Sequence, residues 1–164
     1  MIKEIIYFAL IFFLLGLIQF SFLKGLITSF NFHFLLFLSV FLLAFFEKKF
    51  SGKTLFFFLA AGLLYEFHSQ SFFGVYLGTF SLLFLSTSLV RKTVDISRYF
   101  GGLTLFMASL LGFYVFLEMS SLVFTGGILR INLLEIAANF LLFLILWSIV
   151  YVFQKKSSKV FRIG

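Results

Sequence analysis

The chain has 164 residues, of which 62% are hydrophobic and 12% are charged, with a net charge of +7. A soluble domain is roughly 45–50% apolar, so a water-soluble fold of this size cannot bury the apolar side chains present here. Cysteine is absent, which excludes disulfides and thiolate chemistry. The basic residues form short clusters between apolar runs, a pattern typical of topology signals at an anionic membrane face and not of nucleic-acid binding.

The apolar runs predict an all-α membrane protein. A helix needs about 20 apolar residues to cross the hydrocarbon core. The first run is interpreted as a retained helix, because it exceeds the roughly 7–15 residues of a signal-peptide core and no small-residue cleavage site follows it. We expect a single integral membrane domain over residues 1–164, built as a bundle of about six transmembrane helices. The expected helices cover residues 5–23, 30–46, 54–67, 72–90, 99–118 and 133–153.

The polar residues at the ends of these segments have ordinary structural interpretations. We expect His33 to be an interfacial side chain at the start of the second helix, not a ligand. Asn132 and Glu135 resemble a capping box, with Asn132 as the cap and Glu135 reaching back to its amide. Arg130 is a possible partner for Glu118 or Glu135, which flank the loop before the last helix.

The distribution of basic residues predicts the orientation. Six helices place both termini on one side of the membrane, and that side carries eleven of the thirteen Lys and Arg residues. The other side carries only Lys24 and Arg130. Since basic residues concentrate on the cytoplasmic side, we expect a multi-pass protein with both termini in the cytoplasm. The polar corner at residues 66–71 then faces outward.

Glu66 in this corner is the main candidate functional residue. Charges at membrane depth are costly and are functional suspects by default. Thirteen residues separate Glu66 from Lys53, and they span only about 20 Å of a core about 30 Å thick. His68, Gln70, Tyr65 or the backbone of the corner are its possible partners. Either Glu66 holds a tight hairpin together, or it belongs to a partner-docking or ligand site.

Three glycines surround this acid. Gly62 lies one helical turn before Glu66 and shares its face. Gly74 and Gly78 form a small-xxx-small pattern that permits close helix contact. The structural interpretation is that these glycines let the third and fourth helices pack together.

The sequence predicts a non-enzymatic protein without catalytic residues, cofactor or metal. It contains no HExxH, GxSxG or Walker A motif. Ser69 and Ser71 lie beside His68, but a triad is defined by geometry, which nearness in sequence does not supply. A transporter subunit coupled to a cytoplasmic ATPase remains open.

The corner resembles the signature of the rod-shape-determining MreD family. That signature is roughly G-L-L-x-D, then small polar residues, a bulky residue and Gly, and the chain has Gly62-Leu63-Leu64-Tyr65-Glu66 followed by residues 67–74. An apolar helix ending at Arg91 and Lys92 also fits the family pattern. The resemblance covers about thirty residues, with Glu66 where the family usually has Asp, and without the Pro commonly found near the second helix.

The resemblance implies a non-enzymatic, multi-pass protein of the bacterial inner membrane that belongs to the cell-elongation machinery. Such a protein would bind a bitopic MreC-like partner and help to regulate peptidoglycan synthesis together with MreB, RodA and penicillin-binding protein 2. Gly62, Glu66, His68, Gly74 and Gly78 would form its partner-binding or structural motif. The family fold is also similar to the substrate-binding subunits of energy-coupling-factor vitamin transporters, which makes such a subunit the alternative.

Overall fold

Helices are the only regular secondary structure in the described part of the chain. The computed structural model describes residues 2–23, 31–46, 52–69, 72–95, 99–127 and 132–160, and contains no strand within them. The prediction of an all-α fold is therefore confirmed, as is the count of about six helices. The helices are α1 (Ile2–Leu17), continued by the π-helical segment η1 (Ile18–Leu23), α3 (Phe34–Phe46), α4 (Gly52–His68), α5 (Val75–Thr93), α6 (Tyr99–Thr125) and α7 (Leu133–Val160).

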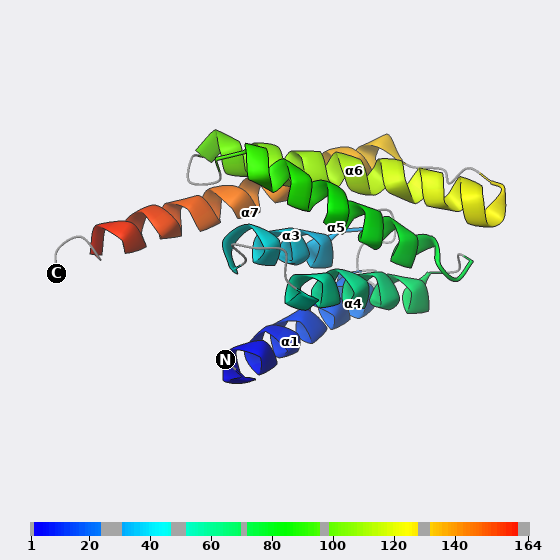
Figure 1. The fold of residues 1–164 in the computed structure, drawn as a ribbon, viewed down its shortest axis with the longest axis horizontal. Coiled ribbons are helices and arrows are strands. Elements are labelled where there is room, and N and C mark those ends of the chain that lie inside the picture. The colour runs from blue at the N-terminus through cyan, green and yellow to red at the C-terminus, as the bar shows by residue number, and fades with distance from the viewer. Residues whose placement is uncertain are drawn as a thin grey trace.

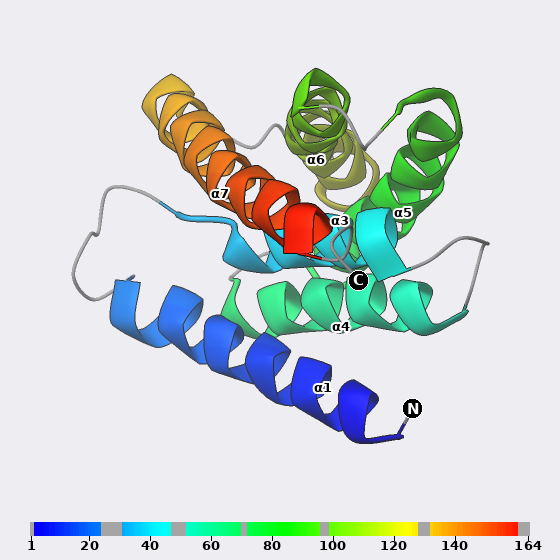
Figure 2. The same ribbon diagram turned by 90° about the vertical axis from the view of Figure 1, so that its left-hand side faces the viewer.

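The helices lie in layers around α3. Helices α5, α6 and α7 form one layer, α3 lies beneath them, and α4 and then α1 follow on the other side (Figures 1 and 2). The start of α1 and the end of α7 lie at the same end of the molecule, and the α4–α5 corner and the end of α6 lie at the opposite end (Figure 1).

Helix α3 is the centre of the core because almost every side chain on it is apolar and its neighbours surround it. Leu35, Leu36 and Val40 are completely buried. Aromatic rings fill the space around α3: Phe37 stacks on Phe106 of α6 at a centroid distance of 4.6 Å and meets Phe143 of α7 edge-on at 5.3 Å. Such ring pairs add to the stabilisation that burial provides.

Several helices differ in length from the prediction. Helix α6 was expected to end at residue 118 but continues to Thr125, so the first half of the expected loop is helical. The helix continues because the hydroxyl groups of Ser121 and Thr125 bond within its last turn, and it ends at Gly126, whose φ of +65° suits glycine. Helix α7 extends to Val160, beyond the expected end at residue 153.

The second helix begins later than expected, at Phe34. Residues 31–33 are not helical, because their backbone groups bond elsewhere: the carbonyl of Asn31 and the N–H of His33 both pair with the side chain of Asn139. Helix α3 has only 13 residues and is about 20 Å long. Its first turn is buried, since Leu35 and Leu36 are completely buried, and the N–H groups of that turn need partners inside the molecule.

Two described helices are long and apolar enough to cross a membrane, Tyr99–Thr125 and Leu133–Phe153. Three shorter apolar stretches accompany them, namely Leu10–Ser21, Phe34–Ala44 and Thr54–His68. The length and composition of two helices are weak evidence for a membrane, because core helices of soluble proteins can be equally long and apolar.

Candidate functional site

Glu66 caps the N-terminus of α5 from the last turn of α4. Its Oε1 accepts hydrogen bonds from the backbone N–H groups of Gly74, Tyr76 and Leu77, at 3.0, 2.6 and 3.1 Å. These are N–H groups that a helix N-terminus leaves without intrahelical partners, and a carboxylate there also interacts favourably with the helix dipole. These donors belong to the start of α5 and not to the backbone of residues 66–71, which was one of the partners considered from sequence. Glu66 is only 7% exposed, and its Oε2 is buried without a hydrogen-bond partner.

The three glycines do not share one contact. Gly62 packs against α5: a Cβ added there would lie 3.2 Å from the Leu77 Cα and 3.3 Å from the Tyr76 carbonyl oxygen. Gly74 and Gly78 instead face Phe124 of α6. The prediction that all three let the third and fourth helices pack is therefore confirmed for Gly62 and wrong for the other two. Gly74 has a further role, because its φ of +110° lets the chain turn into α5.

His68 does not pair with Glu66. Its Nδ1 lies 2.9 Å from the Leu64 carbonyl oxygen of its own helix, and its ring stacks on Phe20 at a centroid distance of 4.4 Å. The side chain is exposed. His68 therefore joins α4 to η1. Gln70 and Ser71, the other polar residues considered at this corner, lie outside the described residues.

Exposed phenylalanines surround the corner that Glu66 holds. Phe67, Phe72 and Phe73 are 77%, 59% and 64% exposed. Phe72 also stacks on Phe124 at a centroid distance of 6.3 Å, which joins the corner to the end of α6. The corner is thus fixed from within by Glu66 and apolar on its outside. We call Phe67, Phe72 and Phe73 the corner patch.

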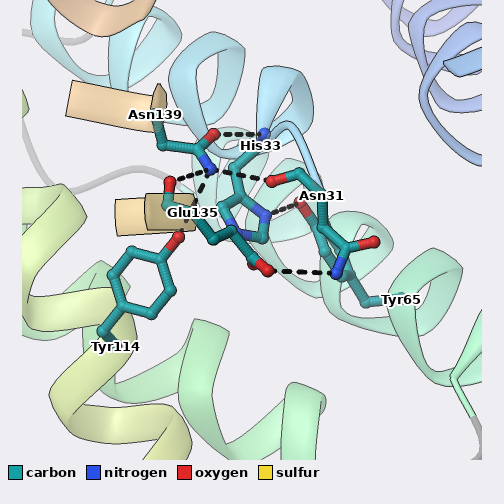
Figure 3. A network of polar contacts seen from close by, with 6 residues as sticks. All are labelled: Asn31, His33, Tyr65, Tyr114, Glu135 and Asn139. Carbon is teal, nitrogen blue, oxygen red and sulfur yellow. Dashed lines mark hydrogen bonds and ion pairs between the residues drawn. The ribbon is translucent and has the colours of Figure 1, made fainter. Parts of the chain in front are cut away.

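A second polar cluster lies around His33 (Figure 3). His33 is 4% exposed, so the expectation of an interfacial side chain is wrong. Its Nδ1 lies 2.7 Å from the Tyr65 hydroxyl, and its Nε2 lies 3.5 Å from Oε1 of Glu135 without a hydrogen-bond partner. The packing of α4 and α7 around residues 31–33 buries the ring.

Asn139 of α7 joins this cluster together. Its Oδ1 accepts the His33 N–H at 2.9 Å, and its Nδ2 lies 2.7 Å from the Asn31 carbonyl oxygen and 3.3 Å from the Tyr114 hydroxyl. A buried amide whose donors and acceptor are all used fixes the positions of the groups around it. We call Asn31, His33, Tyr65, Tyr114, Glu135 and Asn139 the His33 cluster.

The predicted capping box at the start of α7 is half correct. Asn132 Oδ1 accepts the Leu134 N–H at 2.9 Å, as an N-cap does. Glu135 does not reach back to the Asn132 amide. Its carboxylate points to Asn31, whose Nδ2 lies 3.4 Å away, and to His33. Arg130, a possible partner for this acid, lies outside the described residues.

Gln19 completes the polar interior and was missed from sequence. It lies in η1, is 6% exposed, and its Oε1 accepts the Leu35 N–H at 3.1 Å. Gln19 and Asn139 thus satisfy the backbone at the start of the short helix α3. The sequence did offer a signal for both residues, because each is a lone amide inside an apolar run. Polar groups there are costly and need partners.

The arrangement has the chemistry of a structural network. In the described residues, no group of three or more His, Cys, Asp or Glu side chains lies close enough together to hold a metal ion. No protein-family model, curated protein or solved structure matches the chain.

Proposed function

We propose that the chain is a multi-pass protein of the bacterial inner membrane, with six helices crossing the bilayer and both termini in the cytoplasm. Large apolar side chains are exposed along all the helices except the central α3, and the described polar groups of the interior bond to one another and to the backbone. An apolar exterior of this extent suits lipid and not water. The basic last turn of α5 and the basic end of α7 lie at the same end of the molecule (Figure 1).

Within that membrane, the proposed role is that of a non-enzymatic component of the cell-elongation complex. It binds an MreC-like bitopic protein and acts with MreB, RodA and penicillin-binding protein 2 in peptidoglycan synthesis and cell shape. The motif at residues 62–74 suggests this role. The observation that carries it is the corner itself, in which the acid of the motif is bonded to three backbone amides and three exposed phenylalanines surround it.

The corner patch is the proposed contact with the partner. An apolar surface on a rigid turn loses little conformational entropy on binding, and aromatic side chains contribute strongly to interfaces. Because Glu66 bonds inward, its role in docking is to hold the patch in place and not to touch the partner.

The test compares phenylalanines at the two ends of the molecule. Replacing Phe67, Phe72 and Phe73 together by Ala should abolish copurification of the MreC-like protein and leave cells rounded. Phe100→Ala is the matched control, since Phe100 is 76% exposed at the start of α6, at the opposite end. Equal copurification with the triple variant and the control, at equal protein levels, would contradict the proposal.

The alternative function is substrate capture for an energy-coupling-factor vitamin transporter. An acid that faces outward would suit the capture of a substrate. Glu66 instead bonds to the α5 backbone, which argues against this function. Asn31 and the partly exposed Glu135, at the edge of the His33 cluster, are the polar groups that would meet a ligand. Purified protein that retains a small molecule at nanomolar affinity, together with an uptake defect on gene deletion, would favour this function over the first.

A further inference from the structure

Helix α7 is held to the rest of the molecule at two points of different chemistry. At the middle of α7, the Trp147 Nε1–H donates to the Tyr99 carbonyl at 2.8 Å, and the Tyr99 and Ser148 hydroxyls lie 2.9 Å apart. Near its N-terminal end, Glu135 and Asn139 contact residues 31–33. We call these the Trp147 contact and the Glu135 contact. Only the second contains a carboxylate and an imidazole.

The Glu135 contact is incomplete as it stands. The distance of 3.5 Å between His33 Nε2 and Glu135 Oε1 exceeds the usual 2.7–3.2 Å of an N–H···O bond. The other carboxylate oxygen lies 3.4 Å from Asn31 Nδ2, which is also long. Yet His33 Nε2 is buried, and a buried polar atom without a partner is unfavourable. The carboxylate is therefore held close to the imidazole and to the Asn31 amide without a short bond to either.

Protonation of His33 would change this contact and little else. Among the residues that the structure describes, the groups that titrate or carry charge and face the ring are Tyr65 of α4, Tyr114 of α6 and Glu135 of α7. The two tyrosines stay neutral in the range from pH 4 to 7. The Tyr65 hydroxyl either donates to Nδ1 or accepts from it, so it tolerates both forms of the ring. A second ring proton therefore acts through Glu135, by forming a charge-assisted bond.

We propose that His33 and Glu135 form a pH-sensitive latch that fixes the N-terminal end of α7 against residues 31–33. As the pH falls, the imidazolium draws the carboxylate in and this end of α7 tightens. As the pH rises, the carboxylate is released from His33, while the Asn139 bonds and the Trp147 contact still hold the helix. The latch does not depend on the proposed partner.

The composition of the chain makes a direct test possible. With no cysteine, Leu134→Cys introduces a single site for a spin label, on a side chain that is 66% exposed beside Glu135. Trp147 is the only tryptophan and reports on the other contact. Because burial lowers the pKa of His33 below its ordinary value, the label in the purified, detergent-solubilised protein should lose mobility as the pH falls from 7 to 4, while the Trp147 emission stays constant.

The two histidines of the chain separate the latch from other titrations. His33→Gln and Glu135→Gln should each abolish the change in mobility, and His68→Gln, at the exposed histidine, should retain it. Should a latch variant fail to fold, ¹⁵N-histidine spectra of His68→Gln follow His33 alone. Its titration must coincide with the change in label mobility. A label that responds equally in folded His33→Gln, or a His33 titration with a different midpoint, would overturn the proposal.

Discussion

Glu66 is bonded to backbone amides of the next helix and not to groups of its own helix. One carboxylate oxygen takes three N–H groups from the first residues of α5 and the residue before it. This use of a buried acid explains why an ionisable residue is tolerated beside apolar runs.

A graded series at Glu66 should separate its charge from its reach. Glu66→Gln keeps an acceptor oxygen and should lower stability by about 1 kcal/mol, since only the charge is lost. Glu66→Ala leaves the three amides without this acceptor and should cost about 2–3 kcal/mol. Thermal unfolding in detergent measures both. Equal stability of Glu66→Ala and the wild type would show that water replaces the carboxylate.

Gly102 should be as sensitive to substitution as a core residue. A Cβ on Gly102 would overlap the ring of Trp147, which is completely buried. Gly102→Ala should therefore destabilise the protein by about 1–3 kcal/mol, as overpacking does, and shift the Trp147 emission. Gly52→Ala is the control, since nothing lies within 4 Å of its Cβ position. Unfolding of the two variants at the same temperature would contradict this prediction.

At the scale of elements, α4 and α5 are joined by two contacts one helical turn apart. Gly62 lets the helices approach, and Glu66 bonds to the α5 backbone beside that contact, so we expect the two to be coupled. The neighbours of Gly62 are the Leu77 Cα and the Tyr76 carbonyl, and backbone atoms cannot move aside as a side chain does.

A double-mutant cycle measures this coupling. Gly62→Ala should push the helices apart and lengthen the Glu66 bonds, so that Gly62→Ala and Glu66→Gln together cost less than the sum of the two. A coupling of about 0.5 kcal/mol or more is expected for residues that share one contact. Additive changes in the free energy of unfolding would mean that the two residues act independently.

The lengths of the helices also matter at this scale. Helix α6 has 27 residues and α7 has 28, so each is about 40 Å long, whereas a membrane core is about 30 Å thick. Helix α3 has only 13 residues. The backbone polar groups at the start of this short central helix are therefore satisfied by Gln19 and by the segment that Asn139 holds.

At the scale of the whole molecule, the proposed topology places the two ends of the bundle on opposite sides of the membrane. Single cysteines at the exposed residues Thr93 and Lys155 should react with an impermeant maleimide only after cells are permeabilised. A cysteine at Gly127, at the other end of α6, should react in intact cells. The cysteine-free background makes each signal unambiguous. Reaction of Thr93→Cys in intact cells would contradict the topology.

Much of the helical architecture followed from local pattern, and the contacts between helices did not. Apolar runs separated by polar connections predicted six helices, and the corner at Glu66 was located correctly between two of them. The ends of α6 and α7 were placed too early, because the polar residues taken as a loop or a tail are also compatible with a helix. His33 was assigned to the interface because it lies at the start of the expected second helix.

The sequence by itself determined that this is an all-α chain with an unusually apolar exterior, and which stretch holds its main polar corner, since composition and periodicity are local properties. Tertiary structure alone decided what the polar side chains do. Asn139 bonds to His33 across 106 positions, and Glu66 bonds to an oriented helix end. Such contacts depend on how the helices pack, and in an apolar chain many packings bury similar surface, so only the assembled fold shows which donor meets which acceptor.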